Sequence, residues 1–243
     1  MNIKVIGAGG FGTEIASRMS SEGIEDVSFA AIDIDRDELE DSELSEVLKI
    51  GPDSPLGGGA EGNVEMGINA AKNALLKIKP MTDNAEVVVL AAGFGGGTGT
   101  GALPLIAKLA HENGCHVCAA VKFPYGFEGG KKSEDSQKAL NLLKECTDNF
   151  LLFDVKFIVK EGESPHHPEV FGIPFEKTTI KELEGKVSMD GYSDLIYSEV
   201  RDYVKKLCSC SDRKAVKEAG NLFFGYTAQQ DANLVQSALG GLY

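Results

Sequence analysis

The sequence predicts an α/β protein built on a mainly parallel sheet with helices on both faces. Over roughly the first 160 residues, short apolar runs typical of buried strands alternate with segments whose apolar residues recur at helical spacing. Glycine-rich loops at residues 7–12, 57–62 and 93–101 follow or flank predicted strands. In a parallel sheet the carboxyl ends of the strands meet at one edge, where ligands bind. We therefore expect the three loops to share one site.

The strands and helices can be placed from their apolar patterns. Residues 86–90 predict a buried strand, and Leu103, Ile106 and Ala110 mark one face of a helix over residues 102–113. The predicted elements are strands at 3–6, 27–32, 86–90, 117–121 and 150–153, helices at 13–19, 66–78, 102–113, 136–143 and 193–208, a helix or loop at 39–48, and an exposed polar loop at 161–168.

The glycine loop at residues 93–101 (GFGGGTGTG) is the most informative segment, because it joins a predicted strand to a predicted helix. Glycines let backbone N–H groups converge on one point without a side chain in the way. The helix N-terminus favours an anion, and Thr98 and Thr100 carry hydroxyl donors. No lysine follows the last glycine, so the loop is not a P-loop. A flexible linker is the alternative, but linkers rarely stand between a strand and a helix. The loop therefore predicts a phosphate cradle.

Composition and charge narrow the classes of function. The formal net charge is −13 over 243 residues, which argues against direct binding to nucleic acid. No apolar run approaches the roughly 18 residues of a membrane span. The chain enters a predicted strand at residue 3, so no signal peptide is expected. These observations favour a soluble cytoplasmic protein.

The cysteines and histidines do not predict a metal site. Five cysteines are scattered along the chain, which suggests reduced thiols. Cys115 and Cys118 have the spacing of a zinc or redox motif, with His111 and His116 nearby. On the predicted strand, however, Cys118 and His116 share one face and Cys115 takes the other. Cys208 and Cys210 are likewise not predicted to bind a metal. His166 and His167 are interpreted as solvated side chains of the polar loop, with metal binding as the alternative.

A dinucleotide-dependent oxidoreductase is a competing interpretation of the first glycine loop. Residues 7–12 resemble a dinucleotide fingerprint, and Asp33 or Asp35 could be the acidic residue expected about 20 residues later. This interpretation leaves the loops at 57–62 and 93–101 without a role. Three loops around one edge are better suited to a nucleotide held by its phosphates from several sides.

Taken together, these segments resemble the tubulin/FtsZ family of filament-forming GTPases. Residues 95–101 (GGGTGTG) resemble the signature loop of that family, which is a specific motif. The matching segments follow the order of the family over residues 1 to about 160: 6–12 resemble its first nucleotide loop, 31–35 the second, 59–67 the third and 123–129 the fifth, and Lys132 stands where the family has a basic residue.

The resemblance implies a set of residues around a guanine nucleotide. The backbones of the first and signature loops would hold the α- and β-phosphates, Ala60 would sense the γ-phosphate, and Glu128 would accept a hydrogen bond from the ribose. The implied nucleotide-binding residues are Gly7, Gly9, Gly10, Phe11, Asp33, Ala60, Gly93, Gly95, Gly96, Gly97, Thr98, Gly99, Thr100, Pro124, Glu128, Lys132, Ser193 and Asp194.

Asp194 and Ser193 are assigned through the central helix of the family. Guanine presents N–H donors, so an aspartate is its natural reader, and in the family this aspartate begins the central helix. Residues 193–208 carry an apolar stripe typical of such a helix, which places Asp194 at the reading position. A purely structural role is the alternative for both residues. Asp194 would then be an acid in the first turn of the helix, favoured by the helix dipole, and Ser193 would be its N-cap.

Asp212 is the candidate catalytic residue. In the family, a loop after the central helix carries two aspartates that enter the nucleotide site of the next subunit and position the attacking water. Here Ser209 replaces one aspartate and Asp212 keeps the other. The predicted helix is also about two turns shorter than in the family, a difference of roughly 11 Å. GTP hydrolysis is therefore expected only if Asp212 reaches the site of the next subunit, and a solvated loop acid is the alternative for Asp212.

The resemblance divides the chain into a GTP-binding domain at 1–192, a central helix at 193–208 and a reduced or truncated C-terminal domain at 209–243. Residues 213–219, 220–226 and 231–239 resemble a helix, a strand and a second helix of the smaller domain. A lone strand with Phe223 and Phe224 exposed is marginal. It could pair with the main sheet or be covered by a partner protein, or the sequence could be truncated.

Two functions of this ancestry are open. The first is a cytoskeletal protein that binds GTP or GDP, assembles head to tail and hydrolyses GTP at the subunit contact. The second is a non-polymerising or hydrolysis-deficient scaffold or regulator that binds the same nucleotides. In both, the expected ligand is a guanine nucleotide, with Mg²⁺ carried by the nucleotide as a further candidate. The first adds self-association as the expected partner interaction.

Overall fold

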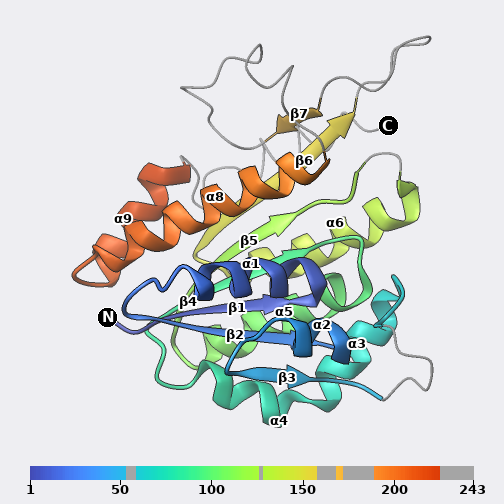
Figure 1. Ribbon diagram of the computed structural model, residues 1–243, viewed down its shortest axis with the longest axis horizontal. Coiled ribbons are helices and arrows are strands. Elements are labelled where there is room, and N and C mark those ends of the chain that lie inside the picture. The colour runs from blue at the N-terminus through green and yellow to red at the C-terminus, as the bar shows by residue number, and fades with distance from the viewer. Residues whose placement is uncertain (53–58, 126–127, 158–167, 172–188, 225–243) are drawn as a thin grey trace.

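The computed structural model of the chain describes residues 1–52, 59–125, 128–157, 168–171 and 189–224 (Figure 1). The predicted helix at 231–239 lies outside these residues. None of the described helices is long and apolar enough to cross a membrane.

One seven-stranded sheet organises the molecule, in the order β3-β2-β1-β4-β5-β6-β7. Its strands are parallel except β7, which pairs antiparallel with β6. Central strands β1 and β4 are almost wholly buried, as expected for a parallel sheet covered on both faces. The strands are β1 Ile3–Ala8, β2 Val27–Asp33, β3 Val47–Lys49, β4 Val87–Gly93, β5 His116–Lys122, β6 Asn149–Phe157 and β7 Pro168–Phe171.

Helices cover both faces of the sheet, which confirms the predicted fold class (Figure 1). Side chains of α3, α5 and α6 form a core with one face of the strands. Side chains of α1, α8 and α9 form a second core with the other face. The helices are α1 Gly9–Ser21, α2 Arg36–Asp41, α3 Val64–Asn73, α4 Leu75–Ile78, the 3₁₀ helix η1 Lys79–Thr82, α5 Gly97–Glu112, α6 Gly130–Lys144, α8 Met189–Cys208 and α9 Arg213–Phe224.

Local capping fixes where several helices begin. The Asn63 side chain accepts a hydrogen bond from the N–H of Met66 at the start of α3. Asp35 caps α2 by accepting from the N–H of Asp37. Asp212 accepts from the N–H of Ala215 in the first turn of α9. Each cap satisfies a backbone donor that has no partner within the helix.

Some predicted elements were wrong. The strand expected at 220–226 is wrong over 220–224, because those residues continue α9, where Val216, Ala219 and Phe223 recur at helical spacing. Helix α8 begins at Met189, so Ser193 lies inside the helix and is not its N-cap.

Other differences concern short strands and element ends. A helix or loop was expected over residues 39–48, but strand β3 begins at Val47 and ends at Lys49. Strand β7 begins at Pro168, which is the last residue of the expected polar loop. Both strands are short and lie at opposite edges of the sheet, so their pairing, more than any sequence periodicity, defines them. The expected helix at 66–78 divides at Ala74 into α3 and α4.

Candidate functional site

A cavity of about 600 Å³ opens at the carboxyl ends of β1, β2, β4 and β5. The first and third predicted glycine loops come together here with residues 59–62 of the second, whose residues 57–58 lie outside the described residues. This meeting is expected for the carboxyl edge of a parallel sheet. Its lining residues are Gly9, Gly10, Phe11, Asp33, Asp35, Glu38, Gly59, Ala60, Glu61, Gly62, Gly93, Phe94, Gly96, Gly97, Thr98, Gly99, Lys122, Phe123, Pro124, Tyr125 and Glu128.

Two loops contact each other through glycines that no other residue could replace without a shift. Gly9 has a φ of +73°, and a Cβ on it would lie 3.0 Å from the backbone nitrogen of Gly99. A Cβ on Gly99 would lie 3.3 Å from the carbonyl oxygen of Ala8 at the first loop, and only 2.4 Å from that of Gly93 within the loop at 93–101. Because these backbones touch, the N-termini of α1 and α5 open into the same cavity. Converging N–H groups and helix N-termini favour an anionic ligand.

The two threonines of the signature loop have different partners. Thr100 is buried, and its hydroxyl oxygen accepts a hydrogen bond 2.9 Å long from the N–H of Gly95. Thr100 therefore shapes the loop from inside. Thr98 lines the cavity and donates a hydrogen bond to the carboxylate of Asp33.

Asp33 is the last residue of β2 and is buried. Its carboxylate accepts a hydrogen bond from the N–H of Ile34 at 2.7 Å and from that of Asp35 at 3.3 Å. Burial raises the pKa of Asp33, while the hydrogen bonds from Thr98 and these two amides act in the opposite direction. Asp33 therefore ties the second loop to the signature loop.

Acidic side chains dominate the charge of the cavity. Glu38 faces Gly10 so closely that a Cβ on Gly10 would lie 3.2 Å from the Glu38 Oε1 atom. Burial raises the pKa of Glu38, and the charges of Asp33 and Asp35 raise it further. An anion that enters the cavity therefore meets repulsion on this side. Among the described residues, no three His, Cys, Asp or Glu side chains are arranged as ligands for a metal ion.

Glu128 and Lys132 form an ion pair at the other side of the cavity. Lys132 Nζ lies 2.8 Å from Glu128 Oε2, and the N–H of Tyr125 donates to Glu128 Oε1 at 2.8 Å. Burial raises the pKa of Glu128, but the hydrogen bonds from Lys132 and Tyr125 outweigh it and lower the pKa overall. Glu128 is thus held ionised as a hydrogen-bond acceptor.

Lys122 is the last residue of β5 and stands between two aromatic rings. Its Nζ atom lies 5.1 Å from the centre of the Phe11 ring and 4.7 Å from that of Tyr125. These distances are within the range of cation–π interactions. Sequence reasoning missed Lys122, although its place directly after the predicted strand at 117–121 could have pointed to it.

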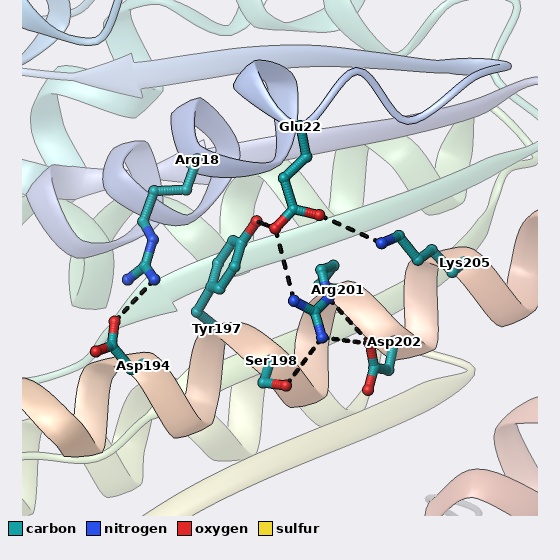
Figure 2. A network of polar contacts seen from close by, with 8 residues as sticks. All are labelled: Arg18, Glu22, Asp194, Tyr197, Ser198, Arg201, Asp202 and Lys205. Atoms are coloured by element: carbon teal, nitrogen blue, oxygen red, sulfur yellow. Dashed lines mark hydrogen bonds and ion pairs between the residues drawn. The ribbon is translucent and has the colours of Figure 1, made fainter.

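Asp194 lies outside the cavity, in a polar network between α1 and α8 (Figure 2). Its Oδ1 atom is 2.8 Å from Arg18 Nη2. Arg18 is nine residues beyond Gly9 along α1, or roughly 13 Å at 1.5 Å per residue. The Arg18 guanidinium also lies 4.0 Å from the ring centre of Tyr197.

The rest of this network joins the end of α1 to α8 (Figure 2). The Tyr197 hydroxyl donates a hydrogen bond to Glu22, and Lys205 Nζ lies 3.3 Å from the same carboxylate. The hydrogen bond from Tyr197 lowers the pKa of Glu22. Asp194 therefore belongs, in this structure, to the contacts that hold α8 against α1.

Asp212 lies at the opposite edge of the sheet from the cavity. It follows the end of α8, where Cys208 Sγ lies 4.0 Å from the carbonyl oxygen of Glu25, just before β2 begins. The amino ends of the strands therefore lie near Asp212 and the carboxyl ends lie at the cavity. Its carboxylate, which is exposed, caps α9.

The structure brings most of the predicted site residues together. Gly9, Gly10, Phe11, Asp33, Ala60, Gly93, Gly96, Gly97, Thr98, Gly99, Pro124 and Glu128 line the cavity. Gly7, Gly95 and Thr100 support its loops, and Lys132 reaches it through Glu128. Ser193 and Asp194 on α8 are not among its lining residues. Asp35, Glu38, Glu61 and Tyr125 line it but were not among the predicted residues.

Comparison with known proteins gives consistent results. A family model described as "Tubulin/FtsZ family, GTPase domain" matches residues 2–161. The cell division protein FtsZ of Mycoplasmopsis pulmonis is 31% identical over 206 residues, which cover 84% of this chain and 53% of that protein. FtsZ of Aquifex aeolicus is 41% identical over 150 residues, covering 62% of this chain and 41% of that protein. The chain thus spans about half, or less, of the length of these curated relatives.

Solved structures show the same likeness. An FtsZ structure from M. jannaschii superposes with a TM-score of 0.71 at 26% identity, covering 90% of this chain and 62% of that chain. A CetZ2 protofilament from Haloferax volcanii with GTPγS bound superposes with a TM-score of 0.65, covering 88% of this chain and 61% of that chain. At 22% identity, the second comparison shows the fold alone.

Proposed function

Because this chain belongs to the tubulin/FtsZ family, we propose that its cavity binds a guanine nucleotide and that copies of the chain assemble head to tail with the nucleotide at the contact. The observation that carries the proposal is the meeting of three glycine loops around one cavity at the carboxyl edge of the sheet. Backbone N–H groups and two helix N-termini supply what a phosphate chain requires. A volume of about 600 Å³ is within the range of small-molecule sites.

Each loop has a role in this proposal. The backbone at Gly9 and Gly10 and that at Gly96–Gly99 hold the phosphates, and Ala60 senses the terminal phosphate. Glu128, held ionised by Lys132, accepts a hydrogen bond from the ribose. Base recognition by Asp194 and Ser193 requires Asp194 to exchange Arg18 for the guanine. GTP and GDP are the expected ligands, with Mg²⁺ accompanying the phosphates.

The positions of the cavity and Asp212 support head-to-tail assembly. They lie at opposite edges of the sheet, so stacking copies in one direction places the Asp212 of one copy over the cavity of the next. Such a contact joins two different surfaces and extends into a filament when it does not close. The Asp212 carboxylate would then orient a water molecule towards the terminal phosphate.

A second candidate function is a guanine-nucleotide binder that hydrolyses slowly or not at all. Ser209 stands where the family has an aspartate, and the carboxylate of Asp212 is already engaged as the cap of α9. Both observations argue against a catalytic role for Asp212 at the nucleotide of a neighbouring copy. In this case the nucleotide is a structural or regulatory ligand, and the protein acts as a scaffold or regulator.

GTP turnover and light scattering across a protein concentration series with Mg²⁺ test the proposal. Hydrolysis between copies predicts that phosphate release per molecule rises with concentration and that scattering rises with it. Binding with flat, negligible turnover supports the second candidate. If calorimetry on nucleotide-free protein detects neither GTP nor GDP binding, both functions are excluded.

A further inference from the structure

Lys122 is the basic residue of the cavity. In the part of the chain that the structure describes, no other lysine or arginine lines it. Lys122 ends β5, and its backbone pairs in register with Gly93 at the end of β4. The strands therefore fix the Cα atom of Lys122 at the carboxyl edge of the sheet, beside the start of the signature loop.

The ammonium of Lys122 rests on aromatic rings instead of carboxylates. Phe11 and Tyr125 flank it at 5.1 and 4.7 Å, and no described carboxylate forms a salt bridge with it. Glu128 is close enough for Lys122 to contribute to lowering its pKa, but both Glu128 oxygens already have partners in Lys132 and the N–H of Tyr125. A half-buried cation is thus left available in an otherwise acidic cavity.

The rings place this cation between the two loops expected to hold phosphates. Phe11 directly follows Gly9 and Gly10, and its Cβ atom would lie 3.1 Å from a Cβ on Gly93. Gly93 precedes the signature loop. An anion held by the two loops therefore comes near the Lys122 ammonium, which can leave the faces of the rings to meet it.

We propose that Lys122 is a specificity-determining residue that supplies the positive charge for the phosphate chain, with Phe11 and Tyr125 holding its ammonium in place before the nucleotide binds. The proposal rests on the proposed binding of guanine nucleotides. It assigns the positive charge that faces the phosphate chain to one side chain, in a cavity whose other charged lining residues are acidic and whose glycine loops contribute only backbone dipoles.

Calorimetric titration of the full chain with GDP tests the proposal. We expect Lys122→Met to weaken GDP binding about tenfold, or about 1.4 kcal/mol. The matched control is Lys131→Met, which removes the same charge from an α6 side chain that is 86% exposed and paired with Asp135 outside the cavity lining. It should bind GDP like the wild type. The loss in Lys122→Met should shrink as KCl rises, because salt screens the missing charge.

A second variant separates charge from packing. Lys122→Arg keeps the cation and the contact with the rings, so it should retain most of the affinity. Thermal unfolding verifies that all variants are folded. Equal GDP affinity in Lys122→Met and the wild type overturns the inference and leaves the proposed function standing. Equal, salt-independent losses in the Met and Arg variants also overturn it, since they indicate packing. A wild type that binds no GDP overturns both.

Discussion

At the scale of the residue, Glu38 is the side chain that most directly opposes an anion at the first glycine loop. Its carboxylate lies against Gly10, and its pKa is raised by burial and by the charges of Asp33, Asp35, Asp41 and Glu14. These charges are all of one sign. A phosphate beside Gly10 adds another negative charge, so the nucleotide favours the protonated form of Glu38.

This arrangement predicts that GDP affinity depends on pH. Because the pKa of Glu38 is raised, the repulsive charge is lost as pH falls through that pKa, and affinity should be higher at acidic pH than at neutral pH. Glu38→Gln should bind GDP roughly threefold to tenfold more tightly at pH 7.5. Calorimetry at acidic and at neutral pH measures this.

The control for Glu38 is its neighbour Glu40 on α2. Glu40→Gln removes the same charge from an exposed position outside the cavity lining and should leave both affinity and pH profile unchanged. The pKa of Asp33 is also raised, so its titration should leave a smaller pH dependence of GDP affinity in Glu38→Gln. An affinity that is the same in Glu38→Gln and the wild type at both pH values would show that the Glu38 charge does not oppose nucleotide binding.

At the scale of the element, helices α3 and α5 cross with their backbones in contact. A Cβ on Gly101 of α5 would lie 2.5 Å from the carbonyl oxygen of Val64, and a Cβ on Gly67 of α3 would lie 2.2 Å from that of Gly97. The crossing holds the N-terminus of α5, with Gly97, in the cavity wall. The packing of two helices thus sets the position of the signature loop.

This crossing predicts that Gly101→Ala destabilises the protein. The added methyl group meets backbone atoms that cannot move aside, so α3 and α5 must separate, at a cost of about 1–3 kcal/mol. Urea denaturation measures the loss. Gly130→Ala is the control, because no atom lies within 4 Å of a Cβ at that first residue of α6. It should be neutral or slightly stabilising. Equal stability of Gly101→Ala and the wild type would contradict the close crossing.

At the scale of the whole molecule, the separation of the cavity from Asp212 allows the trans mechanism to be tested by mixing variants. Asp212→Asn removes the acid but keeps a good N-cap for α9, so stability should change little. Thr98→Arg places bulk in the cavity wall and should abolish nucleotide binding. Each variant alone should lack GTPase activity. A mixture should regain part of it, because the Asp212 of one variant serves the intact cavity of the other.

The outcome of the mixing experiment separates the two candidate functions. Recovered phosphate release in the mixture supports hydrolysis at a contact between copies. Full activity in Asp212→Asn alone excludes the carboxylate from the reaction, and no activity in the wild type favours the binder. Thermal unfolding of Thr98→Arg shows whether the variant retains the fold.

Much of the fold and part of the site follow from sequence patterns. Buried strands such as β4 and glycine loops such as 93–101 are local signals, and parallel topology then brings the loops together. The short edge strands β3 and β7 depend on pairing, which no local pattern records. The partners of Asp194 and Lys122 depend on contacts distant in sequence, such as Arg18 with Asp194, 176 residues apart. The resemblance to the central helix of the family suggested a base reader at Asp194, and the ion pair with Arg18 could not be foreseen from the sequence.

Cys118 lies on β5 and is buried under α8, so the reactivity of its thiol depends on whether α8 stays packed against the sheet. Its Sγ atom lies 3.1 Å from the Tyr203 hydroxyl, and burial raises the pKa of Cys118 to about 12, so it carries almost no reactive thiolate at neutral pH. Burial raises the pKa of Cys208 as well, but Cys208 is exposed and its thiol can be reached from solvent. An alkylating reagent should therefore consume Cys208 first and reach Cys118 only as often as α8 lifts from the sheet. The rate at which Cys118 is alkylated therefore reports how often α8 separates from the sheet.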